Sequence, residues 1–501
     1  MKLDFKTKFF YAGGDFAINI MWQLTVFYLM FFYTDVFGLS PAKAGLVFFL
    51  AKIWDAITDP IMGYIADNTS TRWGKFRPYI LFGSIPALTA IILCFTAPDL
   101  SQTGKFYWAL CTYITFTTLY TIIAIPFGSL IPAMTQDMNE RTSLASFRYL
   151  GGSSGSIVVA ALTLWLVQQF ESPGVGFPIV VSIFAIVAAI FFFLCFFYTK
   201  EKYSKVYEKR ISIKRNLSMI ASNFPLQFIV VAILGTWMAN NIKQVTVIYF
   251  VKYNLQLGPY FGLILLAVII QIMLGAFLAN LIKDKFEKKN IYIIGTALYV
   301  VSDLIIYFVT GYENFLLLAF VGFFSFIGFG MAGVATWSMI ADTIEYGEWK
   351  SGFRAEGVIN SSYVCIFKLS IGFSAWLAGI ILERTNYIPN SETQNIETLD
   401  GLFLMGYIFP VIAGSIAMII MFFHRYDSKF YKKIFSELST NKVVISPNGL
   451  KAPPAFAATT ILIHPIDKNL LLPFPQTSKI EHITNAVVKL SAIGDRKKVI
   501  I

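Results

Sequence analysis

The sequence is poor in charge. Asp, Glu, Lys and Arg make up only 14% of its 501 residues, whereas 56% are hydrophobic. A soluble globular domain carries roughly 25% charged residues. The deficit excludes an ordinary soluble protein and predicts that most of the surface faces lipid. The 49 phenylalanines suit such lipid-facing helix surfaces.

Cysteine is also scarce, and its placement excludes two kinds of site. The four cysteines, Cys94, Cys111, Cys195 and Cys365, all lie within apolar stretches. Their spacing fits neither a disulfide framework nor a metal site, so they are interpreted as small apolar packing residues. A cleavable signal is not expected, because Met1 to Lys8 is polar and the first apolar stretch is long enough to span a bilayer.

Twelve stretches are long and apolar enough to cross a bilayer core, which needs roughly 20 residues of helix. In a membrane every backbone polar group must be satisfied internally, so these stretches predict helices. The sequence therefore predicts an all-α membrane protein. The predicted spans are 9–36, 42–66, 79–98, 106–131, 143–170, 177–198, 224–251, 257–282, 291–311, 315–340, 357–382 and 402–423.

The net charge of +11 reflects topology and predicts no nucleic-acid partner, because the basic residues sit in short gaps between the apolar stretches. Alternate connections differ sharply in Lys and Arg, and the basic set is expected to be cytoplasmic. With an even helix count, both termini are then cytoplasmic. The basic set holds Lys2, Lys6, Lys8, Arg72, Lys75, Arg77, Arg141, Arg148, Lys200, Lys202, Lys205, Lys209, Arg210, Lys214, Arg215, Lys283, Lys285, Lys288, Lys289, Lys350 and Arg354. The other set holds Lys43, Lys105, Lys252 and Arg384.

The longest basic connection divides the chain into two six-helix halves. The predicted parts are a first bundle over 1–198, a cytoplasmic loop over 199–222, a second bundle over 223–425 and a cytoplasmic tail over 426–501. The segments 63–83 and 275–295 echo each other, since each reads glycine, an apolar turn, Asp, a basic cluster and a new apolar helix. Such halves are how many transporters build a site at the midplane between two bundles.

Charges inside a predicted membrane helix are costly and usually functional. Asp55 and Asp59 are four residues apart and face the same way on a helix. Two carboxylates this close repel each other unless a proton or a cation lies between them. Thr58 offers a hydroxyl oxygen beside them. The pattern favours a cation site, and the alternative is an internal salt bridge with Lys52.

The first predicted helix carries a polar and aromatic stripe. Asp15 and Asn19 are four residues apart, and Trp22 and Gln23 follow a turn later. Sugar hydroxyls need hydrogen-bond partners, and the apolar face of a sugar ring stacks on an aromatic side chain. The stripe favours sugar binding, and the alternative is hydrogen bonding between helices.

Three further charges lie within predicted spans. Lys368 needs a carboxylate or carbonyl partner, and Asp55 or Asp59 across the bundle is the natural candidate. A cation arriving at the two acids would compete with Lys368, which would couple ion binding to helix position. For Lys243 and Asp303, function and structural pairing both stay open.

Six motifs recur in the order found in one transporter family. They are YTDVFGLS (33–40), WDAITDPIMG (54–63), TRWGKFRPYILFG (71–83), IPFGSLIPAMTQD (125–137), ERTSLASFR (140–148) and ADTIEYGEWKSGFRAEG (341–357). The chain resembles the glycoside–pentoside–hexuronide:cation symporters of the major facilitator superfamily over about residues 5–435. The resemblance implies the major facilitator fold and cation-coupled symport of a glycoside or pentoside by alternating access.

The resemblance also implies residue roles. Asp55 and Asp59, the acids already chosen from their spacing, would bind the cation, Na⁺ or H⁺, together with oxygens of Thr58 and Thr121. The two threonines favour sodium. Arg148 and Tyr120 match sugar-binding positions, and Lys368 matches the lysine of the eleventh helix. No cofactor besides the coupling cation is implied, and a monomer in the cell inner membrane is expected.

The chain departs from melibiose permease, a member of this family, at three sugar-binding positions. Asn19 and Ala124 replace two acids, and Gly128 stands where a tryptophan is expected. The helix-one acid, Asp15, lies one turn earlier, in a Gly-Asp pair typical of relatives that carry xylosides or glucuronides. These departures favour a pentoside or another glycoside over melibiose.

Three rival functions compete with sugar symport. A lysolipid-like amphiphile would need a cavity without sugar-binding polar groups, against which Asn19, Gln23 and Arg148 argue. An intramembrane aspartyl protease could pair Asp15 with Asp55 or Asp59, but it would not need twelve helices in two halves, and no enzymatic activity is expected. A non-transporting sensor on the same fold is separable only by a transport assay.

Overall fold

The computed structural model describes residues 3–202, 220, 222–351, 356–424 and 428–441. Within these residues the protein is built from helices and contains no β-strand. Twelve helices have 18 residues or more, six before residue 199 and six after residue 223. The all-α architecture expected from the apolar stretches is confirmed. Residues 203–219 and 221 of the predicted loop 199–222, Arg354, and residues 426, 427 and 442–501 of the predicted tail lie outside the described residues.

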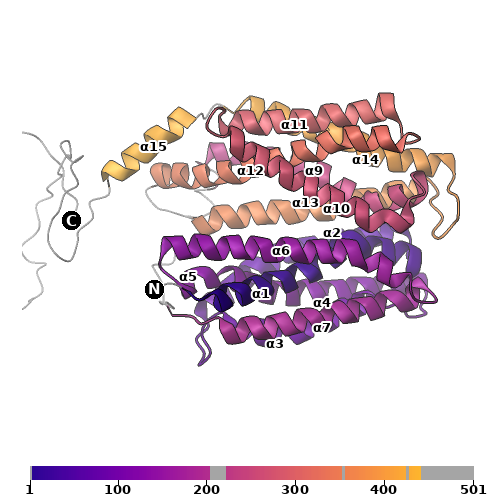
Figure 1. Ribbon diagram of the computed structural model, residues 1–501, viewed down its shortest axis with the longest axis horizontal. Coiled ribbons are helices and arrows are strands. Elements are labelled where there is room, and N and C mark those ends of the chain that lie inside the picture. Colours follow the sequence, from indigo (N-terminus) through magenta and orange to yellow (C-terminus); the bar gives the residue numbers. More distant parts are fainter. Residues whose placement is uncertain (1–2, 203–219, 221, 352–355, 425–427, 442–501) are drawn as a thin grey trace, which may run out of the picture. The chain divides into compact units, whose positions relative to one another are not determined.

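The long helices form two groups (Figure 1). The first half contains α1 Phe5–Leu24, α2 Pro41–Asn68, α3 Arg77–Cys94, α4 Gln102–Gly128, α5 Leu130–Met134, α6 Met138–Val167 and α7 Pro173–Tyr198. The second half contains α9 Phe224–Tyr249, α10 Phe261–Ile282, α11 Lys288–Ile305, α12 Phe315–Ser351, α13 Glu356–Arg384 and α14 Ile396–Phe422. Short π-helical or 3₁₀ turns extend several of them: η1 Thr25–Leu29, η2 Phe32–Val36, η3 Phe250–Asn254, η4 Gly258–Tyr260 and η5 Ile306–Thr310.

Ten of the described helices are apolar enough over 18 residues to cross a membrane. The other two long helices, α1 and α2, carry the charges that hydropathy penalises, including Asp15, Lys52, Asp55 and Asp59. They nevertheless pack inside the same bundle, α1 against α6 and α7 and α2 against α4 and α13. The polar residues of α1 and α2 are therefore candidates for a binding site inside the bundle.

The helix ends differ from the predicted spans where the helices leave the apolar layer. Helix α12 continues to Ser351, eleven residues beyond its predicted end at 340, and α6 begins at Met138. Hydropathy marks the lipid core, whereas the helix ends where its backbone hydrogen bonds end. Arg141, Arg148 and Lys350, counted with the connections in the sequence, consequently lie within α6 and α12.

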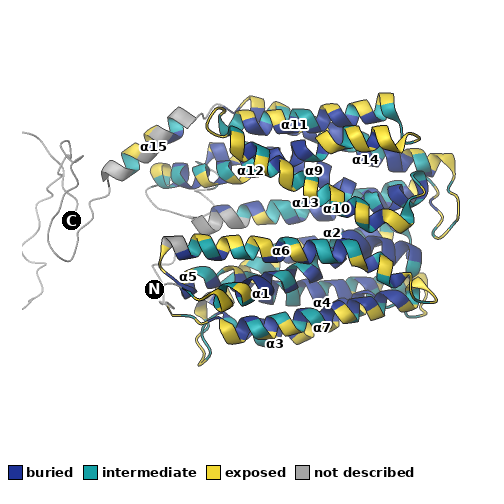
Figure 2. Cartoon of the chain, viewed as in Figure 1, coloured by how far each residue is buried: buried dark blue, intermediate teal, exposed yellow. Residues whose placement is uncertain are grey.

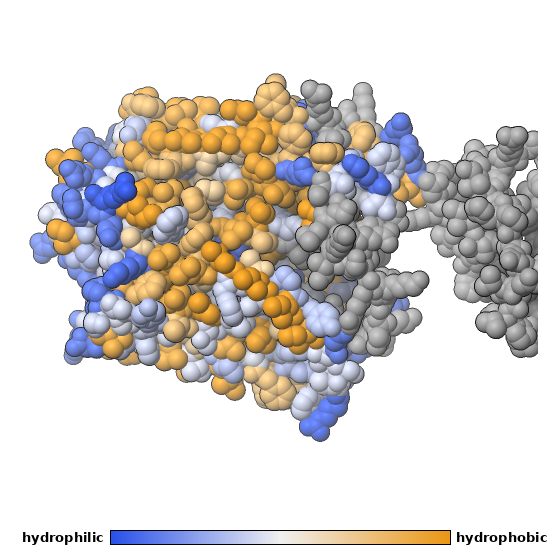
Figure 3. All heavy atoms as spheres, turned by 180° about the vertical axis from the view of Figure 1, so that it is seen from behind, coloured by the Kyte–Doolittle hydropathy of each residue, from blue (hydrophilic) through white to orange (hydrophobic). Residues whose placement is uncertain are grey.

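The surface of the described membrane helices, α1 to α14, is predominantly apolar. Exposed residues alternate with buried ones along most helices (Figure 2), and apolar residues form a broad band across the face seen in Figure 3. Large side chains such as Leu316, Phe308 and Ile85 are 80%, 73% and 69% exposed. So much exposed apolar surface would be unfavourable in water and is what a protein in lipid presents.

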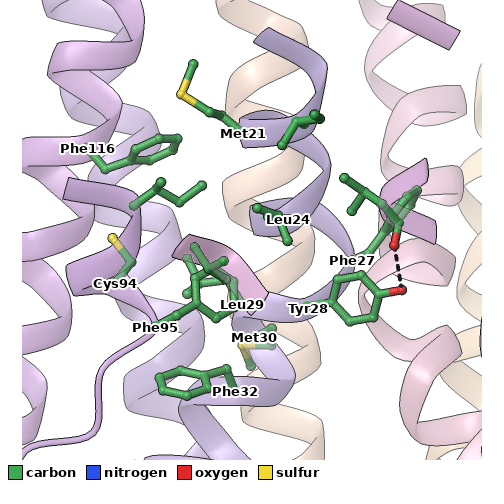
Figure 4. Packing of buried hydrophobic residues seen from close by; sticks show 14 of the residues in the cluster. Met21, Leu24, Phe27, Tyr28, Leu29, Met30, Phe32, Cys94, Phe95 and Phe116 are labelled. Atoms are coloured by element: carbon green, nitrogen blue, oxygen red, sulfur yellow. Dashed lines mark hydrogen bonds between the residues drawn. The ribbon is translucent and has the colours of Figure 1, made fainter. Parts of the chain in front are cut away.

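Aromatic residues dominate the interior of the first half. In Figure 4, Phe116 lies near Met21, and Phe95 and Phe32 lie lower, near Leu29 and Met30. Tyr28 is fully buried, and its hydroxyl donates to the carbonyls of Val159 and Ala160 at 3.3 and 3.1 Å. This bond ties turn η1 to α6 and fixes the end of the first spanning segment.

Two lines of small residues join the halves. On the first line, which we call the α2–α13 seam, a Cβ added at Gly45 would lie 2.5 Å from the Ala375 carbonyl oxygen, and one at Gly379 would lie 2.2 Å from that of Pro41. On the second, between α6 and α10, a Cβ at Gly262 would lie 2.7 Å from the Ala160 carbonyl oxygen. These glycines allow the helices of opposite halves to approach backbone to backbone.

A buried polar cluster, here the Asp35 cluster, joins the halves at one end. The Asp35 carboxylate in η2 accepts bonds from the hydroxyls of Tyr253 at 2.9 Å and Tyr387 at 2.8 Å, and Lys252 lies 3.2 Å away. Thr34 adds a fourth donor at 2.8 Å. Because Tyr253, Tyr387 and Lys252 belong to the second half, this cluster holds the halves together at the end where α2 begins.

The chain divides into two units at residue 428, and of the second unit the structure describes the helix α15, Ser428–Asn441. This boundary lies two residues after the predicted start of the tail at 426. The division of the membrane region into parts 1–198, 199–222 and 223–425 stays a prediction.

Gly379→Leu should destabilise the protein. Its side chain would meet the Pro41 carbonyl oxygen and force α2 and α13 apart. Overpacking of this kind costs about 1–3 kcal/mol, so a lower melting temperature in detergent is expected. Gly333→Leu is the matched control, because a Cβ there meets nothing within 4 Å and the gain in helix propensity is the same. Equal melting temperatures in the two variants would contradict the role of the seam.

Candidate cation and sugar site

The two carboxylates of α2 meet a lysine of the opposite half. The Nζ atom of Lys368 in α13 lies 2.6 Å from Asp59 Oδ2 and 3.5 Å from Asp55 Oδ2. Asp55 is 1% exposed and Lys368 is 8% exposed. The predicted pairing of Lys368 with these acids is confirmed.

A second lysine neutralises the pair. Lys52, one turn before Asp55, is 1% exposed, and its Nζ lies 2.9 Å from Asp55 Oδ2. The salt bridge that was the alternative to a cation site is therefore present alongside the contact with Lys368. Two ammonium groups and two carboxylates balance one another, which relieves the repulsion expected between Asp55 and Asp59.

The two predicted threonine ligands differ in their surroundings. The Thr121 hydroxyl donates to Asp59 Oδ1 at 2.9 Å, which places its oxygen beside the acids. The Thr58 hydroxyl instead donates to the backbone carbonyl of Trp54 at 3.1 Å, one turn back on its own helix. The lone pairs of the Thr58 oxygen can still coordinate a cation, but its proton is used in this hydrogen bond.

The ligand atoms that this site offers to a cation are oxygens. Among the described residues Asp55 Oδ1 is buried without a hydrogen-bond partner, so it is a ready acceptor. In the same part of the chain no group of three or more His, Cys, Asp or Glu side chains is placed to hold a metal ion. A cation at Asp55 and Asp59 would thus be completed by hydroxyl or carbonyl oxygens, as a hard ion requires.

Asp15, Asn19 and Arg148 form one hydrogen-bonded group between α1 and α6. Arg148 Nε lies 2.9 Å from Asp15 Oδ1, and Asn19 Nδ2 donates to Asp15 Oδ2 at 3.2 Å. Gly152 makes room for this contact, because a Cβ there would lie 2.5 Å from Asp15 Oδ2. The Arg148 side chain remains 38% exposed, so part of its guanidinium is free to donate to a ligand.

The aromatic part of the stripe lies next to the acid pair. The rings of Trp22 and Tyr120 are 5.5 Å apart, and the Lys52 ammonium is 5.1 Å from the centre of the Trp22 ring. Lys52 thus touches both the predicted cation site and the predicted sugar site. Gln23 behaves differently: its Nε2 donates to Ser156 Oγ at 3.0 Å, which is the hydrogen bond between helices expected under the alternative interpretation of the stripe.

Lys243 and Asp303 pair with each other deep in the second half. Lys243 Nζ lies 2.6 Å from Asp303 Oδ2, and the Ser325 hydroxyl donates to Asp303 Oδ1 at 2.8 Å. Both charged residues are buried. Of the two interpretations left open, structural pairing is present.

Two features escaped the sequence reasoning. Asp35 stands in the first motif, YTDVFGLS, but lies at the end of a predicted span, where a charge does not attract notice. Lys252 was counted only as a charge in a connection. A search for carboxylates near span ends with aromatic hydroxyl groups in the opposite half would have been needed to find the Asp35 cluster.

Comparison with known proteins assigns the chain to a family. The family model described as MFS/sugar transport protein matches residues 10–428. The chain belongs to this family. It is therefore a multi-pass membrane transporter of the sugar-transport class and not an enzyme, and the resemblance to glycoside–pentoside–hexuronide:cation symporters is confirmed.

Several members of this family are similar over nearly their whole length. The uncharacterized symporter YjmB of Bacillus subtilis is 34% identical over 87% of this chain and 96% of its own. The isoprimeverose transporter of Lactiplantibacillus pentosus is 33% identical over 86% and 90%. The putative sulfoquinovose importer of Escherichia coli is 31% identical over 88% and 95%.

Solved structures share the fold at low identity. The nucleoside transporter NupG matches with a TM-score of 0.56 at 15% identity, over 86% of this chain and 99% of that one. A D-xylose-proton symporter matches with a TM-score of 0.59 at 14% identity, over 82% and 97%. These likenesses establish the major facilitator fold for this sugar-transport family member.

Asp303→Leu should strongly destabilise the transporter, because it leaves the buried ammonium of Lys243 uncompensated. Breaking one side of a buried ion pair costs about 3–5 kcal/mol, whereas replacing both partners by apolar residues is often neutral. The double variant Lys243→Met/Asp303→Leu should recover most of the melting temperature in detergent. A single variant as stable as the parent would show that the pair carries no such constraint.

Proposed function

We propose that the protein is a symporter that couples a monovalent cation, Na⁺ or H⁺, to the uptake of a glycoside, with a pentoside as the favoured class. The observation that carries the proposal is the sharing of one lysine by two acids. Lys368 of the second half contacts Asp55 and Asp59 of the first. A change in the charge of the two acids therefore changes a contact between the halves.

The cation and Lys368 compete for the same carboxylates. A buried ammonium left unpaired costs at least a few kcal/mol even on generous insertion scales, so in the empty carrier Lys368 stays on Asp59 and Asp55. A bound cation takes over that charge. Helix α13 is then free to repack, and the change reaches the sugar residues through Lys52, which contacts both Asp55 and Trp22.

Either coupling ion fits the residues, and oxygen content favours sodium. A proton needs only a carboxylate, whereas Na⁺ needs several oxygens. Asp59 Oδ2, the Asp55 carboxylate and the Thr121 hydroxyl lie together here, and Thr58 is adjacent on the same helix turn. The cation is cargo in this scheme, and it leaves with the sugar.

The sugar is assigned to the polar group of α1 and α6. Arg148 and Asn19 supply donors, Asp15 supplies an acceptor, and Trp22 with Tyr120 supplies an aromatic surface for the apolar face of the ring. Two relatives support a glycoside: the isoprimeverose transporter, and a putative glycoside/cation symporter, YagG of Escherichia coli, which is 30% identical over 84% of this chain.

The proposal includes an orientation. The basic connections place both termini in the cytoplasm of a bacterial cell, so the Asp35 cluster lies at the outer end and closes the outer entrance when the halves meet there. The acid pair of the first half is completed by Lys368 of the second half of the same chain, so a monomer is sufficient.

Asp59→Cys should abolish cation-driven accumulation of sugar in proteoliposomes and leave exchange down a gradient largely intact, because the sugar residues remain in place. The assay compares uphill uptake with counterflow of a labelled glycoside. Asp284→Cys, which removes an exposed carboxylate outside the predicted spans, is the matched control. Uphill accumulation at the parent's level in Asp59→Cys would refute the cation assignment.

Lys368→Ala should abolish the coupling between cation binding and sugar binding. In the parent each ligand favours the same state, so sodium and sugar should raise each other's affinity by an equal factor. Without the competing ammonium, either cation binding should survive or tighten, or the acids should take up protons. In both cases the factor by which sodium raises the affinity for sugar should fall towards one. Sugar titrations with and without sodium measure this. A variant that retains the parent's full gain would make Lys368 a structural partner only.

A further inference from the structure

The second half contains a partly open cavity that the proposed mechanism does not use. Its volume is about 200 Å³, and it lies among α9, α10 and α12, with Phe27 of the first half at its border. Aromatic and aliphatic side chains form most of the wall, and a few polar groups interrupt it. That composition is typical of small-molecule sites.

The polar groups of the wall are incompletely satisfied. Asn240 is 1% exposed, and its Nδ2 has no hydrogen-bond partner among the described residues. In the same part of the chain Gln271 Oε1 is buried and likewise unpartnered. Buried polar groups are nearly always hydrogen-bonded, so an unpartnered donor and an unpartnered acceptor on one cavity wall indicate a ligand with hydroxyl groups.

The cavity adjoins the predicted sugar residues. Gln244 borders it and also borders a smaller cavity of about 20 Å³ whose wall includes Trp22 and Lys52. One glutamine side chain thus stands between the Trp22 surface and the larger cavity. A ligand that extends past Trp22 would enter the cavity beside Gln244.

The wall of the cavity shares turn η3 with the Asp35 cluster. Phe250, Val251 and Leu255, in and just after η3, form part of its wall, and Lys252 and Tyr253 of the same turn bond Asp35 across the halves. Separation of the halves at the Asp35 cluster would therefore move a wall of the cavity and open it from that end.

We propose that this cavity is a second saccharide subsite, which takes the unit attached to the sugar ring held by Asp15, Arg148 and Trp22. The inference rests on the proposed function and adds the size class of the substrate, a disaccharide or a glycoside with a bulky second unit. Asn240 Nδ2 donates to a hydroxyl of that unit and Gln271 Oε1 accepts from one. Phe250 and Tyr407 cover its apolar faces.

Two glycines allow the cavity to be filled without disturbing the fold. A Cβ at Gly406 would meet nothing within 4 Å, and one at Gly322 would meet only Ile306 Cδ1 at 3.9 Å. Both residues line the cavity. Gly406→Leu and Gly322→Leu therefore place a side chain in the space assigned to the second unit. Leu263→Phe, which adds bulk at a residue of α10 that is 63% exposed, is the control.

The experiment measures binding of D-xylose and of isoprimeverose, a disaccharide containing xylose, to the purified full-length protein. The parent is expected to bind the disaccharide at least tenfold more tightly, and Gly406→Leu and Gly322→Leu to lose about tenfold in disaccharide affinity with xylose affinity unchanged. Asn240→Leu, which keeps the volume and removes the donor, should show the same selective loss, and Leu263→Phe should match the parent.

The outcomes separate the two proposals. A parent that binds neither probe overturns the proposed sugar class, and this subsite with it. A parent that binds both with equal affinity, or filled variants that keep the parent's preference, overturn the subsite alone. Filled variants that bind both sugars normally but lose co-purifying lipid would assign the cavity to an acyl chain and overturn the subsite as well.

Discussion

The transporter depends on the neutralisation of charge away from water. Lys52, Asp55, Asp59 and Lys368 would each be prohibitively unfavourable alone in a bilayer, and together they form a balanced cluster at the contact between α2 and α13. Because the partners come from both halves, the protein cannot separate α2 from α13 without supplying a substitute charge. In the proposed symport, a monovalent cation would supply that charge.

The same rule of pairing recurs elsewhere. Asp15 faces Arg148, Lys243 faces Asp303, and Asp35 faces Lys252 with three hydroxyl donors. The pairs differ in what surrounds them. Lys243 and Asp303 are enclosed within one half, Arg148 is partly exposed, and Asp35 joins the two halves. In a pair enclosed within one half, each charge needs the other and cannot change partner, whereas a pair between halves or open to a ligand can be exchanged for another partner.

The sequence predicted the fold and the acidic pair because both depend on short-range patterns. Apolar stretches of the length of a bilayer located every long helix, and the spacing of Asp55 and Asp59 placed both on one face. The helix ends could not be predicted as well, since α12 runs on through polar residues to Ser351 after it leaves the apolar layer. The sequence also offered Lys52 and Lys368 as partners of the acids, but it could not show that both contacts form together, because the contact of Lys368 depends on the packing of α13 against α2. The hydrogen bond of the Thr58 hydroxyl to its own helix was not foreseen.

The α2–α13 seam has a consequence for movement. At Gly45 and Gly379 the two helices meet backbone to backbone with no side chain between them, and Gly262 does the same between α6 and α10. Phe49, one turn after Gly45, packs against Phe373 and Trp376 of α13, so side chains interlock only beside the glycines. Helices that meet backbone to backbone at glycines can rotate relative to each other and stay in contact there, whereas interdigitated side chains would first have to separate. The close approach of the helices at these glycines, and any rotation about them, would thus have one origin, the absence of a side chain there.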